Sequence, residues 1–75
     1  MNKYIVTDIY GEINLGDFKL IPNEIYLSNE SCIPNDKSLS EEEQLYIVPV
    51  INEKTGEQYF VTQSEFEDFF VKTSL

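Results

Sequence analysis

Short apolar runs separated by polar turns follow one another along this chain, and they predict a small fold rich in β-strands. Residues 4–10 (YIVTDIY) are rich in β-branched and aromatic side chains and end at Gly11, which predicts a strand. Residues 24–28 (EIYLS) predict a shorter strand, and residues 45–51 (LYIVPVI) give the strongest strand signal in the sequence. Apolar groups fall on both faces of the first run, as expected for a strand inside a small barrel or sandwich.

Turn residues divide these predicted strands. Across residues 12–20 the apolar alternation changes parity at Gly16 and Asp17, which predicts a bulge or a tight turn there. Residues 29–40 are polar and contain a Pro-Asn-Asp turn signal, so we expect a mobile surface loop. The Ser-x-x-Glu spacing at residues 40–43 is that of a helix-capping box, but no apolar face follows it. A single helical turn, a 3₁₀ turn and a loop therefore remain open at this position.

The strongest strand is expected to form a hairpin with the residues that follow it. Residues 54–56 (KTG) fit a short hairpin loop centred on Thr55, and residues 59–61 (YFV) would return antiparallel. Because Pro49 cannot donate a ladder hydrogen bond, we expect this strand at a sheet edge, or a bulge at the proline. The expected cross-strand pairs are Ile51 with Tyr59 and Val50 with Phe60.

The chain is expected to close with a short helix, the one convincing helix in the sequence. Thr62 suits the N-cap position and Glu65 suits N3, so the two residues predict a capping box. Val61 and Phe66 occupy the positions of a hydrophobic staple. We expect the aromatic stripe of this helix to be core, because the rest of the chain has little else to cover its sheet. The stripe, at i, i+3 and i+4, consists of Phe66, Phe69 and Phe70.

Together these elements predict an α+β fold. We expect a small twisted antiparallel sheet of about five short strands, curled toward a partly closed barrel of the SH3-like kind. The short C-terminal helix would cover one open face of that sheet. The comparison rests on the number and length of the strands. Residues 1–75 contain no repeat, linker or low-complexity tract, so we expect a single domain.

The charge of the chain narrows the range of partners. Fourteen acidic residues against five lysines give a formal net charge of −9, and the chain has no Arg, His or Trp. A field of this sign repels nucleic acid and anionic lipid and attracts basic protein surfaces. Residues 36–75 hold nine acidic residues and three lysines, a net charge of −6, against −3 for residues 1–35. The acidic surplus therefore lies mainly in the second half of the sequence.

The residue types in this chain give little support for a catalytic site or a metal-binding site. Hydrolysis by paired carboxylates needs two acids across a cleft, and the chain has no Arg or His to orient a substrate. A zinc site needs Cys and His ligands, whereas this chain has one Cys and no His. The chain also lacks the ligand spacing of a calcium-binding loop. Its one cysteine, Cys32, is expected to be a half-buried or idle thiol. We predict no enzymatic activity, no metal and no cofactor.

Protein recognition is the function that these observations favour. Folding could gather two acidic groups into one carboxylate patch that docks on a basic partner surface, including one that normally binds nucleic acid. In size and charge alone, the chain is similar to small acidic proteins of mobile genetic elements that inhibit nucleases and other DNA-handling enzymes. The candidate partner-binding residues are Glu41, Glu42, Glu43, Glu65, Glu67 and Asp68.

Two other interpretations remain open. The negative charge could serve solubility alone. The chain could instead be a structural or assembly subunit that pairs through a sheet edge beside residues 45–51, or through its Phe-rich helix. The sequence has no apolar run of membrane-spanning length and no signal-peptide pattern, and one cysteine cannot form an internal disulfide. The expected location is therefore the cytoplasm.

Overall fold

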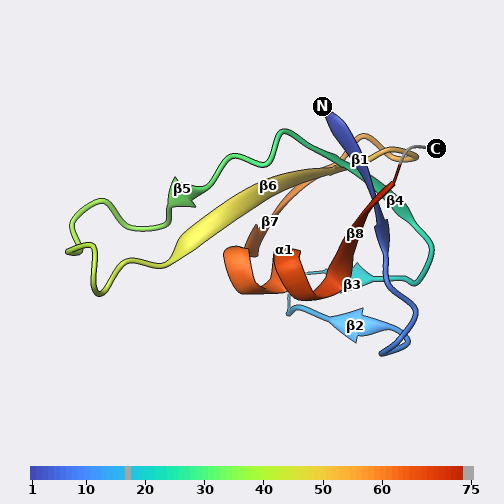
Figure 1. Cartoon of the computed structure of the whole chain (residues 1–75), viewed down its shortest axis with the longest axis horizontal. Coiled ribbons are helices and arrows are strands. Elements are labelled where there is room, and N and C mark those ends of the chain that lie inside the picture. Colours follow the sequence, from blue (N-terminus) through green and yellow to red (C-terminus); the bar gives the residue numbers. More distant parts are fainter. Residues whose placement is uncertain (17, 74–75) are drawn as a thin grey trace.

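The computed structural model describes residues 1–16 and 18–73 as an antiparallel sheet with one short helix (Figure 1). The prediction of an α+β chain dominated by an antiparallel sheet is therefore confirmed. A small second sheet contains β2 (Ile13–Asn14) and β3 (Lys19–Leu20), and the helix is α1 (Gln63–Phe69). The main sheet contains β1 (Asn2–Val6), β4 (Ile25–Ser28), β5 (Ile33–Pro34), β6 (Tyr46–Asn52), β7 (Gln58–Thr62) and β8 (Phe70–Thr73).

Strand β6 is the centre of the main sheet because it pairs along both of its edges. β7 pairs with one edge, β4 and β5 share the other, and the order continues from β4 through β1 to β8. Helix α1 connects β7 to β8, the two outermost strands in this order. Among the described residues no ladder joins β7 to β8, so closure of the sheet into a barrel is not found.

Pro49 lies within a strand that is paired on both sides, so the expectation of an edge strand is wrong. The structure accommodates the proline at an interruption of the ladder. β5 pairs with β6 at Ile47 and Tyr46, and β4 pairs with it at Ile51 and Asn52. Between these two contacts the chain leaves the edge of β6, beside Pro49. A residue without an N–H donor is tolerated where the ladder is already broken.

The β6–β7 hairpin forms as predicted, but its register differs from the prediction by one residue. Asn52 explains the difference, because its Oδ1 accepts hydrogen bonds from the N–H groups of Lys54 and Thr55 at 2.9 and 3.1 Å. The N–H of Asn52 also donates to the carbonyl of Glu57 at 2.9 Å. The loop therefore covers residues 53–56, one residue more than expected. The observed pairs are Ile51 with Gln58, Val50 with Tyr59 and Pro49 with Phe60.

Helix α1 begins as predicted and ends earlier than predicted. The Oγ1 of Thr62 accepts from the N–H of Glu65 at 3.1 Å, and the Oε1 of Glu65 accepts from the N–H of Thr62 at 2.8 Å. This reciprocal capping box confirms the predicted N-cap. At the other end Phe70 has extended backbone angles and starts β8, a strand that the sequence did not predict. Pairing with β1 explains why the chain turns from helix to strand here.

The first half of the chain also departs from the predicted boundaries. β1 ends at Val6 instead of continuing to residue 10. The turn between β2 and β3 fits the expectation at Gly16, which has φ +89°, while the N–H of Leu15 donates to the carbonyl of Phe18 at 2.9 Å. Asp17, the other residue of that prediction, lies outside the described residues. Within the stretch expected to be a loop, the two residues of β5 were not predicted.

One face of the main sheet is the buried core. Side chains from β2, β3 and α1 pack against this face, among them Phe66, whose ring centroid lies 4.8 Å from that of Tyr4. The aromatic stripe of the C-terminal segment is therefore core, as expected. The buried core residues are Tyr4, Val6, Leu20, Tyr26, Val48, Val50, Val61 and Phe70. The partly buried residues packed against them are Ile13, Leu15, Phe18, Tyr59, Phe66 and Phe69.

Candidate functional site

The acidic loop, residues 35–45, joins β5 to β6 and carries the three consecutive glutamates at positions 41–43. The N–H of its first residue donates to the carbonyl of its last residue at 2.8 Å, which closes the base of the loop. The N–H of Asp36 donates to Oε1 of Gln44 at 3.0 Å, and the Gln44 amide donates back to the Asp36 carbonyl. The loop extends well beyond the start of β6 (Figure 1), and its three glutamates are exposed.

Short-range hydrogen bonds also organise the residues within the acidic loop. The Oδ1 of Asp36 accepts from the hydroxyl of Ser38 at 2.7 Å and from its N–H at 3.0 Å. These bonds favour the ionised carboxylate and hold the pKa of Asp36 below its usual range. The N–H of Glu43 donates to the carbonyl of Ser40 at 3.1 Å, so residues 40–43 form a turn and not a helix. The loop thus presents its glutamates from a hydrogen-bonded base.

The second predicted acidic group lies on α1, and its three members differ in role. Glu65 is partly buried, and its carboxylate accepts a hydrogen bond from the N-cap backbone, so its main role is to cap the helix. Glu67 and Asp68 are exposed on the helix surface. Of the helix group, these two are the carboxylates available to a partner.

The sheet register relates the two acidic groups in space. Ile47 lies opposite Thr62, so β6 begins where β7 ends and α1 starts. The acidic loop and the helix therefore start from the same end of the β6–β7 pair, but the loop extends away from the sheet while α1 runs toward β8, so they are two separate acidic groups (Figure 1). We call this region the acidic end, defined by residues 41–43 together with Glu67 and Asp68.

The acidic end carries unneutralised charge. Within residues 1–16 and 18–73, the ion pairs join Lys3 to Glu53 at 3.1 Å and Lys72 to Glu30 at 3.3 Å. None of the six predicted partner-binding carboxylates takes part in either pair. A partner that supplies lysine or arginine side chains would therefore meet carboxylates without an internal counter-ion.

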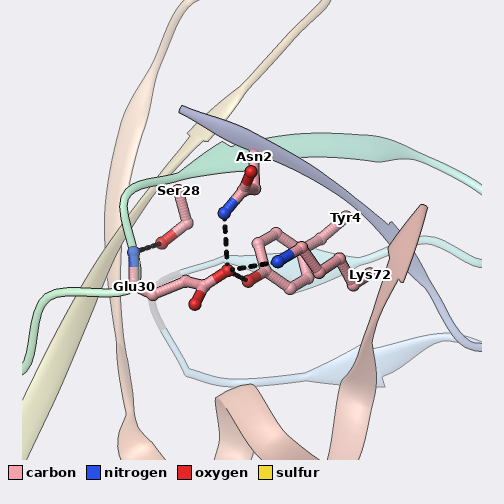
Figure 2. Close-up of polar contacts among 5 residues, drawn as sticks. All are labelled: Asn2, Tyr4, Ser28, Glu30 and Lys72. Carbon is pink, nitrogen blue, oxygen red and sulfur yellow. Dashed lines mark hydrogen bonds and ion pairs between the residues drawn. The ribbon is translucent and has the colours of Figure 1, made fainter. Parts of the chain in front are cut away.

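A polar cluster around Glu30, which the sequence did not predict, ties the two chain ends together (Figure 2). The Oε1 of Glu30 accepts from Nδ2 of Asn2 at 2.7 Å, from the hydroxyl of Tyr4, and from Nζ of Lys72 at 3.3 Å. The N–H of Glu30 donates to Oγ of Ser28 at 3.0 Å. One carboxylate thus joins β1 to β8, and its partners lie too far apart in sequence to form a readable motif.

The pKa values of Glu30 and Tyr4, the two main titratable groups of this cluster, shift in opposite directions. The hydrogen bond from Tyr4, followed by those from Asn2 and Lys72, holds the pKa of Glu30 below its usual value. Burial, reinforced by the hydrogen bond to Glu30 and by its negative charge, raises the pKa of Tyr4 to about 12. Both shifts favour a charged carboxylate beside a neutral phenol, so the cluster is a structural clamp at neutral pH.

An open groove of about 440 Å³ lies at the other end of the β6–β7 pair, next to the hairpin loop. There, Oε2 of Glu24 accepts from Nδ2 of Asn52 at 3.2 Å, and the Tyr59 hydroxyl donates to Oε2 of Glu57 at 2.5 Å. That last hydrogen bond raises the pKa of Tyr59, and burial raises the pKa of Tyr26. The groove is lined by Asn23, Glu24, Ile25, Asn52, Glu53 and Lys54.

Other chemistry is sparse in the part of the chain that the structure describes. No group of three or more Cys, Asp or Glu side chains is placed there to hold a metal ion. Cys32 is exposed and free, rather than half-buried. The seven-residue α1 is the one described helix, and it is far too short to cross a bilayer.

Comparison of the chain with protein-family models, with curated protein sequences and with solved structures returns no match. The geometry of the described residues is therefore the basis for assigning a function.

Proposed function

We propose that the protein is a small non-enzymatic interaction module that docks its acidic end on a basic surface of a partner protein. The observation that carries the proposal is the Ile47–Thr62 register, which directs the acidic loop and α1 from one end of the sheet. Five exposed carboxylates contribute there, and none forms an ion pair with a described lysine.

Electrostatics gives this arrangement a mechanism. Long-range attraction between a net charge of −9 and a basic patch raises the rate of encounter, and close contacts then fix the orientation of the complex. The acidic loop, held at its base by the Asp36–Gln44 hydrogen bonds, reaches outward to meet a concave or channel-like surface. Carboxylates in such a channel would occupy the sites where phosphates bind. The protein would therefore inhibit or occlude a nucleic-acid-handling enzyme as a decoy, without binding nucleic acid itself.

Two further parts of the proposal concern fold and location. The strand order β7-β6-β4-β1-β8, with a short helix that connects its two outermost strands β7 and β8, supports a partly open barrel of the SH3-like kind. We place the protein in the cytoplasm, because its single cysteine gives it no disulfide to maintain. A role like that of inhibitors from mobile genetic elements fits its small size and acidic charge.

The test is affinity capture from an extract of the native host, followed by competition with DNA. The tagged wild-type chain is compared with Glu41→Gln/Glu42→Gln/Glu43→Gln and with the matched control Asp8→Asn/Glu12→Gln/Glu57→Gln. The proposal expects a basic protein retained by the wild type and the control at low salt, with much weaker retention by the loop variant. With the purified partner, the wild-type chain should displace double-stranded DNA. Equal retention by all three chains, or a ternary complex with DNA, would contradict the decoy mechanism.

An assembly role through a sheet edge is the second candidate function. Among the described residues β7 pairs with β6 alone, so it leaves one edge for another strand. Pairing through main-chain hydrogen bonds would be nearly indifferent to salt, whereas docking of the acidic end weakens as salt is added. The Phe-rich helix is a poor alternative route, because Phe66 and Phe69 pack against the core and Phe70 is buried.

A further inference from the structure

The face of the main sheet opposite the core is also apolar. Residues that lie directly opposite one another in a ladder share a face, and Pro49 with Phe60, Leu27 with Ile51, and Ile5 with Ile25 are such pairs. They alternate along each strand with the buried core residues, so they point away from α1 and the β2–β3 pair. The apolar residues of this outer face are Ile5, Ile25, Leu27, Ile33, Ile47, Pro49, Ile51, Phe60 and Val71.

This outer face is exposed at its margins, half-buried at its centre and almost free of charge. Phe60 is 54 % exposed, Val71 55 % and Ile33 39 %. Among the described residues, the ladder registers place Lys3 on this face, and Lys3 is paired there with Glu53, which follows β6. In a chain with 19 charged residues, a sheet face that carries a single ion pair is unusual, because a solvated antiparallel face ordinarily alternates apolar-in with polar-out. Contiguous apolar patches of this kind mark interaction surfaces.

The outer face holds a projection and a hollow side by side. A hollow of about 100 Å³, open to solvent, is bordered by the apolar residues Met1, Leu27, Pro49 and Ile51 and, at its rim, by the polar residues Ser28, Asn29 and Gln58. Phe60 lies directly across the ladder from Pro49, so its exposed ring flanks the hollow. A closed apolar cavity of about 150 Å³ admits a benzene ring, so an open hollow of the observed size can take part of a phenyl ring. Two copies related by a two-fold axis could each insert Phe60 into the hollow of the other.

The charge distribution permits such a pair despite the net charge of −9. The carboxylates of the acidic end and of the Glu30 cluster lie off this face, and Glu53, which lies beside it, is paired with Lys3. Strand spacing of about 4.8 Å and a rise of about 3.3 Å per residue give a five-strand face of roughly 500 Å². Two copies would bury roughly 1,000 Å², near the lower limit for a specific interface. The interface would therefore be weak and would depend on concentration.

We infer that the outer face of the sheet is the interface of a weak two-fold homodimer, centred on Phe60 and the hollow beside Pro49. The inference does not depend on the proposed docking of the acidic end, which uses a different surface. The two also respond to salt in opposite directions. Added salt screens the repulsion between two chains of like charge and strengthens the dimer, whereas it weakens binding to a basic partner.

Sedimentation equilibrium of the purified full chain tests the inference, over micromolar to millimolar concentration at low and high salt. The variants are Phe60→Ser and Ile51→Ser, with Ile9→Ser as the matched control, because Ile9 is 78 % exposed but lies outside the sheet. Far-ultraviolet circular dichroism checks that each variant is folded.

The wild type and the control should dimerise, more tightly at high salt, and the Phe60 and Ile51 variants should raise the dissociation constant at least about tenfold. A wild-type chain that stays monomeric at every concentration and salt would overturn the inference and leave the face to a foreign partner. A dimer unaffected by both face variants would overturn it as well. A dimer that weakens with salt would place the contact on charged surfaces instead.

Discussion

Ile47 lies opposite Thr62 in the β6–β7 ladder, and this pairing sets the end of the acidic loop beside the start of α1. Thr62 is also the N-cap of α1. The residue that fixes the start of the helix is thus part of the ladder that fixes the base of the acidic loop. Local capping chemistry and sheet register together determine where the carboxylates of the acidic end are presented.

Loss of the N-cap is expected to destabilise the fold. Thr62→Ala removes the hydroxyl that accepts from the N–H of Glu65, and such substitutions lower the free energy of unfolding by about 0.5–2 kcal/mol. Equilibrium unfolding in urea measures the change. Thr62→Ser keeps the hydroxyl and should retain most of the stability. Equal losses in both variants would show that the methyl group, and not the cap, matters.

The Glu30 cluster predicts a loss of stability at acidic pH. The pKa of Glu30 is lower in the folded chain than its ordinary value of 4.5, so its contribution is present above that pH and declines as pH falls below it. Glu30→Gln should be less stable than wild type at neutral pH, and this difference should shrink as the pH falls below 4.5. Urea unfolding at a series of pH values measures it, with the exposed Glu12→Gln as control. A difference that stays constant with pH would contradict the prediction.

Tyr4 predicts a loss of stability at alkaline pH. Its pKa rises from 10.0 to about 12 on folding, so the neutral phenol stabilises the fold below pH 10 and this stabilisation is lost as pH rises toward 12. Tyr4→Phe keeps the ring that packs on Phe66 but removes the titrating hydroxyl. The variant should therefore show a flatter decline in unfolding free energy across this range. An unchanged slope would assign the alkaline decline to other tyrosines.

The β2–β3 pair is expected to be an essential cover of the core. Leu20 on β3 is fully buried, so Leu20→Ala should lower the free energy of unfolding by about 2–5 kcal/mol. Leu39→Ala, in the acidic loop and 41 % exposed, is the matched control and should change it by no more than about 0.5 kcal/mol. Thermal and urea unfolding of the two variants compare them. Similar small losses would mean that the hairpin only loosely covers the sheet.

Local signals in the sequence predicted the elements whose structure is decided locally. The Thr62–Glu65 capping box is contained within four residues, and both of its hydrogen bonds form. The run around β6 and the turn that follows it were also predicted. The hairpin register was missed by one residue because the side chain of Asn52 closes a longer loop, a preference that the Thr-Gly signal did not reveal.

Pairing between distant segments decided the features that sequence patterns missed. The Phe-Phe-Val run at residues 69–71 is compatible with either helix or strand, and β1 selects the strand. Pro49 suggested an edge because the break between β4 and β5 cannot be read from its neighbours. The candidate acidic residues were identified from charge, but their common end of the sheet follows from the register alone. The apolar run at residues 45–51 predicted a strand, but it did not reveal that one apolar face of the sheet would lie away from the core.

The association rate constant with the captured partner, measured by stopped-flow fluorescence at several salt concentrations, tests the central claim most directly. Wild type and the matched control should associate fast at low salt and slow steeply as salt is added. Glu41→Gln/Glu42→Gln/Glu43→Gln should associate roughly tenfold more slowly at low salt and show a shallower salt dependence. Identical rate constants for the loop variant and the wild type at every salt concentration would contradict docking through the acidic end.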